Sequence, residues 1–138
     1  MNGAEYIMLG CLLILSIMDL RTRKISLLPV LLLGLFAMGY RFWENESLWE
    51  VLTGMLPGGV LLLAAWVTKE SIGYGDGIVL LVVGVFCGIK KTVAILGISL
   101  ILAALMAMLL LVLRRAGRKT ELPFLPCLCS GYLLCLLW

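Results

Sequence analysis

The sequence predicts an all-α, polytopic membrane protein, a bundle of about six transmembrane helices with both termini outside. Composition is the first observation behind this. Of 138 residues, 63% are hydrophobic and 14% are charged, and the mean hydropathy is +1.15. Soluble domains have about 45–50% apolar and about 25% charged residues. A soluble fold of this size has too small an interior for so much apolar surface, so the expected solvent is a bilayer.

The positions of the charges are the second observation, because they divide the chain into six apolar segments. These are Tyr6–Met18, Ile25–Tyr40, Leu48–Thr68, Gly77–Ile89, Thr92–Leu113 and Leu122–Trp138. The loops between them are too short to hold another domain, so residues 1–138 are expected to form a single transmembrane domain.

Each segment has its own reason to be a helix. The first lacks the basic region and the cleavage site of a secretory signal, which favours a retained helix. The third and fifth have the ~20 residues of a spanning helix. The first, second and fourth are shorter, but short helices span by recruiting flanking residues or thinning the bilayer. The fourth, closed by Lys90 and Lys91, is alternatively a re-entrant helix, so five or seven spans remain open.

Basic residues indicate the orientation. With the amino terminus outside, the inner loops carry eight of them: Arg21, Arg23, Lys24, Lys69, Arg114, Arg115, Arg118 and Lys119. The outer loops carry three: Arg41, Lys90 and Lys91. This excess favours amino and carboxyl termini outside. The outer loop with Trp43 and Trp49 is acidic and suits a membrane interface. We see no basic patch that would bind nucleic acid.

The chain contains two aspartates, Asp19 and Asp76. On the predicted topology, Asp19 ends the first segment and Asp76 begins the fourth, so both lie at the cytoplasmic boundary. Carboxylates within membrane segments usually face the bundle interior or a water-filled cavity. Each alone also fits an interfacial anchor, with Asp19 paired to Arg23 and Asp76 capping its helix. Their common depth favours a functional pair.

Two carboxyl groups at one site share a proton, so one accepts a proton from water while the other donates one to a carbonyl oxygen. This division of roles hydrolyses a peptide bond without a covalent intermediate. The chain has no histidine, which excludes Ser-His and Cys-His nucleophile systems and the HExxH zinc site. Lys69 and Ser71 form a conceivable pair without further support.

Glycines surround the second aspartate. Gly73, Gly75 and Gly77 leave room for another backbone to approach Asp76, so an extended substrate is expected to lie there. Gly54, Gly58, Gly84 and Gly88 are instead interpreted as residues of helix packing.

Three motifs resemble the type IV prepilin peptidases, including their small, single-domain members. "MDLRTRKISLLPVLLLG" is similar to the helix end that carries the first aspartate of that family. "GYGDGIVLLVVGVFCG" is similar to its GxGD signature, and "ELPFLPCLCSG" to its late Pro-Phe-x-Pro element. They occur in the family's order over nearly the whole chain.

The resemblance implies an aspartyl endopeptidase of the cytoplasmic membrane with its active site near the cytoplasmic face. Asp19 and Asp76 would be the catalytic dyad. The substrate would be a pilin-like precursor, cut after its short basic leader. Gly73, Tyr74, Gly75 and Gly77, with Pro123 and Phe124 at the start of the last helix, are the expected substrate contacts; for the prolines a simple entry kink is the alternative.

The chain departs from the family pattern in three places. Ser26 stands where many members have proline, and Ile78 stands where many have lysine. Long members carry an insertion with paired CxxC motifs and methylate the new amino terminus. This sequence shows no such insertion, so no methyltransferase activity is expected.

No metal or other cofactor is expected. The five cysteines lie in apolar segments without a CxxC motif, as small packing residues do. They are Cys11, Cys87, Cys127, Cys129 and Cys135.

Two functions from other classes remain open. One is a small transporter or channel component whose aspartates bind protons or cations. The other is a catalytically silent relative that binds pilin-like helices as an assembly factor.

Overall fold

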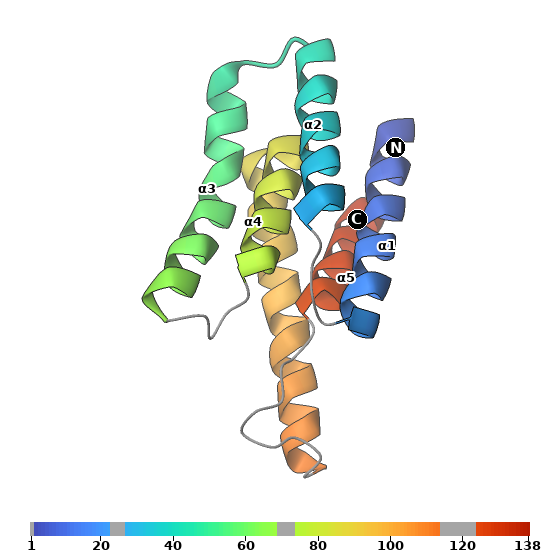
Figure 1. Ribbon diagram of the computed structural model, residues 1–138, viewed down its shortest axis with the longest axis vertical. Coiled ribbons are helices and arrows are strands. Elements are labelled where there is room, and N and C mark those ends of the chain that lie inside the picture. Colours follow the sequence, from blue (N-terminus) through green and yellow to red (C-terminus); the bar gives the residue numbers. More distant parts are fainter. Residues whose placement is uncertain (1, 23–26, 69–73, 114–123) are drawn as a thin grey trace.

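The computed structural model describes residues 2–22, 27–68, 74–113 and 124–138. Every regular element in these ranges is an α-helix, which confirms the predicted all-α class. In chain order the helices are α1 (Gly3–Thr22), α2 (Leu27–Trp43), α3 (Leu48–Val67), α4 (Tyr74–Val112) and α5 (Phe124–Leu137) (Figure 1).

Helix α4 consists of two arms that meet at Gly88. The backbone angles of Gly88, φ 78° and ψ 169°, are not helical and belong to a region that is nearly exclusive to glycine. Residues 74–87 form the first arm and residues 89–112 the second, which turns back beside the first (Figure 1). The fourth and fifth predicted segments are therefore the arms of one element. Its break falls at Gly88, not at the two lysines that were expected to separate them.

Helix α4 is the centre of the bundle. It contacts α2, α3 and α5, and α1 packs against α5 and α2. The tightest contact joins α3 to the first arm of α4. A Cβ on Gly54 would meet the carbonyl oxygen of Gly84, and one on Gly58 would lie 2.6 Å from the backbone nitrogen of Leu81. The prediction that these glycines serve helix packing is confirmed.

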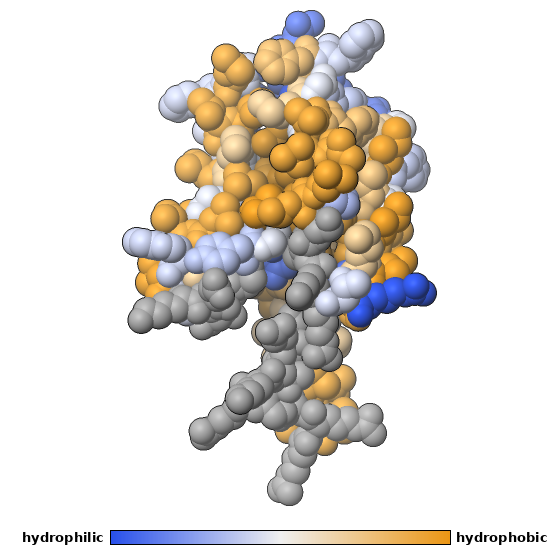
Figure 2. Space-filling view, in the orientation of Figure 1, coloured by the Kyte–Doolittle hydropathy of each residue, from blue (hydrophilic) through white to orange (hydrophobic). Residues whose placement is uncertain are grey.

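The surface of the bundle is largely apolar. Among the described residues, α1, α3 and α4 are long and apolar enough to cross a membrane, and α2 and α5 are shorter apolar helices. Figure 2 shows apolar side chains over much of the upper part of the visible face, with hydrophilic residues at its upper end and in a band near mid-height. Several apolar helices with so much exposed apolar surface indicate a multi-pass membrane protein.

Polar contacts gather at the end of the bundle where α2 connects to α3, here called the α2–α3 end. The side chain of Asn2 donates to the hydroxyl of Tyr40 at 3.3 Å, and that hydroxyl donates to Glu44 at 2.6 Å. Lys91, whose side chain is largely exposed, pairs with Glu5 at 3.4 Å between the start of α1 and the start of the second arm of α4. These contacts show that the start of α1, the end of α2 and the start of the second arm of α4 lie near one another.

Candidate functional site

The two aspartates lie on different helices, near enough for the charge of one carboxyl group to act on the other. Asp19 is in the last turn of α1 and Asp76 in the first turn of α4. They are 57 positions apart in sequence, yet the charge of Asp19 acts on the Asp76 carboxyl group. Both residues are half-buried. The fold thus brings the two aspartates of the sequence within electrostatic reach of each other.

The lengths of two helical segments indicate that the two carboxyl groups lie at a similar height in the bundle. From Glu5 to Asp19 the α1 helix rises about 21 Å, at 1.5 Å per residue. From Gly88 back to Asp76 the first arm of α4 measures about 18 Å. The ion pair between Glu5 and Lys91 places the origins of these two lengths at the same end of the bundle. Both aspartates therefore lie about 20 Å, measured along their helices, from the level of the Glu5–Lys91 ion pair.

The first turn of α4 is held against α3. A Cβ added to Gly77 would lie 2.7 Å from a methyl carbon of Leu62 and 3.4 Å from the Leu62 backbone nitrogen. Gly77 is buried in this contact, Gly75 is half-buried, and Tyr74 is exposed at the start of the helix. Sequence reasoning assigned Gly77 to substrate binding and gave no sign of its packing partner on α3.

The remaining predicted substrate residues are only partly described. Phe124 begins α5, is half-buried and packs against the apolar core. Because α5 runs antiparallel to α1, its first residues lie at the end of the bundle where α1 finishes (Figure 1). Gly73 and Pro123 lie outside the described residues, as does Ser26.

Other reactive groups do not join the two aspartates into a metal-binding cluster. In the part of the chain that the structure describes, no three histidine, cysteine, aspartate or glutamate side chains come close enough to hold a metal ion. All five cysteines are free thiols, buried or half-buried within helices.

Comparison with known proteins gives one family. The model of the type IV leader peptidase family matches residues 6–112, a range that contains both aspartates. A prepilin leader peptidase/N-methyltransferase of Xanthomonas campestris pv. campestris is 30% identical over 135 residues, covering 91% of this chain and 46% of that protein. Proteins of the same name from Pseudomonas aeruginosa and Stutzerimonas stutzeri are 31% and 29% identical over 143 residues, covering 99% of this chain and 49% and 50% of theirs.

The chain spans about half the length of these curated relatives, whose names combine two activities. No solved structure matches it.

Proposed function

This chain belongs to the type IV leader peptidase family, and from that premise we propose that it is an aspartyl endopeptidase of the membrane. It cleaves the short basic leader from type IV pilin-like precursors. The observation that supports the proposal is that Asp19 and Asp76, the two aspartates of the sequence, lie on different helices near enough for their charges to interact.

In the proposed reaction the two carboxyl groups divide the work of a hydrolysis. The ionised carboxylate takes a proton from a water molecule, which attacks the carbonyl carbon of the scissile peptide bond. The protonated carboxyl donates its proton to the carbonyl oxygen. When the tetrahedral species collapses, the same groups return a proton to the leaving amine. Either aspartate can hold the first proton, since the dyad titrates as a unit.

The position of Asp76 supports this chemistry. It stands in the first turn of α4, where the backbone N–H groups have no acceptor within the helix. Gly75 precedes it without a side chain, so a substrate backbone can approach the carboxyl group closely. The exposed Tyr74, with Gly73, Gly77, Pro123 and Phe124, is proposed to line the path of the substrate.

The proposed site opens toward the cytoplasm. Both aspartates lie about 20 Å, measured along their helices, from the level of the Glu5–Lys91 ion pair, which is toward the α2–α3 end. A hydrocarbon core is about 30 Å thick, so they are nearer to the other face. Arg21 follows Asp19 by two residues, and basic residues near helix ends favour the cytoplasmic side. Six crossings with both termini outside remain the topology that we propose. A basic leader would meet acidic groups there.

We propose peptidase activity without transfer of a methyl group. The sequence has no CxxC motif, the feature that the resemblance associates with the methylating members. Purified protein given a cleaved pilin and a labelled methyl donor should transfer no label.

The proposal is tested by co-expressing the protein with a pilin-like precursor and following the precursor on a gel. The wild type should shorten the precursor, and D19N and D76N at matched membrane levels should leave it intact. Asparagine keeps the size and most of the hydrogen bonding of aspartate but cannot exchange a proton. Cleavage that persists in either variant would identify another catalytic pair. A well-folded wild type that cuts no precursor would favour an ion-binding or an assembly role.

A further inference from the structure

The first arm of α4, which carries Asp76 at its start, ends in the chain reversal at Gly88. The last carbonyl groups of a helix lack partners within it. Buried carbonyl groups must be paired inside the protein, and Val85, three residues before the reversal, is buried. The end of this arm therefore needs a hydrogen-bond donor from elsewhere in the bundle.

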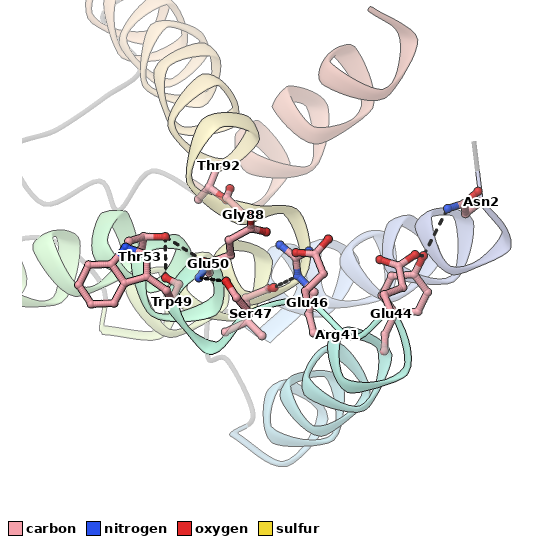
Figure 3. A network of polar contacts seen from close by, with 12 residues as sticks. Asn2, Arg41, Glu44, Glu46, Ser47, Trp49, Glu50, Thr53, Gly88 and Thr92 are labelled. Carbon is pink, nitrogen blue, oxygen red and sulfur yellow. Dashed lines mark hydrogen bonds and ion pairs between the residues drawn. The ribbon is translucent and has the colours of Figure 1, made fainter.

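Arg41, from the last turn of α2, supplies that donor. Its Nε donates to the carbonyl oxygen of Val85 at 2.8 Å, and the residue is buried. Its Nη1 forms an ion pair with Glu46. Its Nη2 lies 3.0 Å from where a Cβ on Gly88 would sit, so the guanidinium fills the space beside the reversal (Figure 3).

The charge of Arg41 suits this place. A cation near the carboxyl end of a helix is stabilised by the helix dipole. A buried arginine also needs a counter-charge, and Glu46 in the connection to α3 provides it. The planar guanidinium serves the carbonyl and the carboxylate at the same time, which a lysine ammonium does less well.

Helix α3 holds the same end of the arm from the other side. A Cβ on Gly54 would meet the carbonyl oxygen of Gly84 and would lie 3.3 Å from the Cα of Gly88. The end of the arm is thus enclosed by α2 through a buried cation and by α3 through backbone contact. From Gly84 to Asp76 the arm is a helix of about 12 Å, so a tilt at its end displaces the aspartate at its start.

We propose that Arg41 is a positioning residue for the peptidase reaction: it holds the end of the first arm of α4 and thereby sets the place of Asp76 relative to Asp19. The inference rests on the proposed function. The Val85 carbonyl that Arg41 binds lies nine residues from Asp76, about 14 Å along the arm, so Arg41 acts only through the arm. A misplacement of about 1 Å in a catalytic group can cost about 100-fold in rate.

The test must separate positioning from stability. R41M alone leaves the half-buried Glu46 carboxylate without its counter-charge, so it would weaken the fold as well. R41M/E46L removes both charges, and replacing a buried ion pair by apolar residues is often neutral for stability. The matched control is K91M, which removes the ion pair with Glu5 at the same end of the bundle without touching Val85.

The full chain is purified in lipid nanodiscs, and melting temperature, kcat and KM are measured with a pilin-like precursor. R41M/E46L should melt near the wild type, with kcat lower by about 10- to 100-fold and KM changed by less than about threefold. R41K, which keeps the cation, should recover part of the lost kcat, and K91M should match the wild type. A kcat of R41M/E46L equal to that of the wild type would overturn the inference. If R41M/E46L does not fold, R41K is compared with K91M instead. A kcat of R41K equal to that of K91M would then overturn the inference.

A second measurement does not depend on activity. Genetically encoded spin labels at Leu20 on α1 and Tyr74 on α4 report the distance between the two helix ends that carry the aspartates. R41M/E46L should shift or broaden that distance distribution, and K91M should not. An unchanged distribution contradicts the positioning role. If the wild type cuts no precursor while R41M/E46L still changes the distance distribution, the proposed function is contradicted and the effect of Arg41 on the position of Asp76 stands.

Discussion

Two adjacent glycines of α3 allow a sharp test of the contact that supports Asp76. A Cβ added to Gly58 would lie 2.6 Å from the backbone nitrogen of Leu81, 2.7 Å from its Cα and 2.8 Å from its Cγ. A Cβ added to Gly59 would meet nothing within 4 Å. G58A and G59A therefore change the same helix by the same atom and differ only in what that atom meets.

The expected magnitudes follow from these distances. At Gly58 two of the three nearest atoms belong to the backbone of α4, so the helices must move apart, and overpacking of this kind costs about 1–3 kcal/mol. At Gly59 the added methyl group meets open space, and alanine in a helix interior is favoured over glycine by about 0.5–1 kcal/mol. Because the preference for alanine is common to both variants, they should differ by the overpacking cost, about 1–3 kcal/mol in the free energy of unfolding.

Reversible unfolding by denaturing detergent in mixed micelles, followed by circular dichroism, measures that difference. G58A should also lose cleavage activity beyond its loss of folded protein, because α3 holds the first arm of α4. Equal free energies of unfolding for G58A and G59A, or a more stable G58A, would refute the close approach of α3 and α4.

Three further predictions concern other parts of the chain. G88A should lower the free energy of unfolding by about 1–3 kcal/mol, because the φ of 78° at Gly88 is strained for alanine. G97A should not lower it, because a Cβ added to Gly97 would meet nothing within 4 Å. The unfolding assay described above compares the two variants. A hydrogen bond with Glu50 and burial raise the pKa of the Glu46 carboxyl above its ordinary value, against the opposing charge of Arg41. The folded state then holds this proton more tightly, so stability should fall as the pH rises from the ordinary glutamate pKa through the raised one, and E46Q should flatten that slope in melting temperatures measured across pH. D19N and D76N should each lower kcat by about 10²–10⁴-fold, measured on purified protein with a pilin-like precursor, while the melting temperature shows that they remain folded.

The all-α class and the places of the helices could be predicted because apolar length and charge position decide them in a membrane. The third segment, predicted over Leu48–Thr68, is the helix Leu48–Val67. Asp19 near the end of a helix and Asp76 at the start of another were also predictable, since charges mark the ends of apolar segments.

Other features depend on contacts that are distant in sequence. The break of α4 at Gly88 rests on a positive φ and on the side chain of Arg41, 47 positions earlier, whereas Lys90 and Lys91 offered the more visible signal. From the sequence Arg41 is only one of the outer-loop cations, because nothing in the sequence indicates that it is buried against Val85. The packing of Gly77 on Leu62 was hidden for the same reason.

The central claim, that Asp19 and Asp76 act as one catalytic unit, is tested most directly by a double-mutant cycle. The value of kcat/KM for a pilin-like precursor is measured for wild type, D19N, D76N and D19N/D76N in the same membranes. If the two carboxyl groups share one reaction, the double variant should be no slower than either single variant, because each substitution already removes the whole unit. If the losses of kcat/KM in the two single variants add, as activation free energies, in the double variant, a shared dyad is contradicted. A single variant that keeps substantial activity would contradict it too.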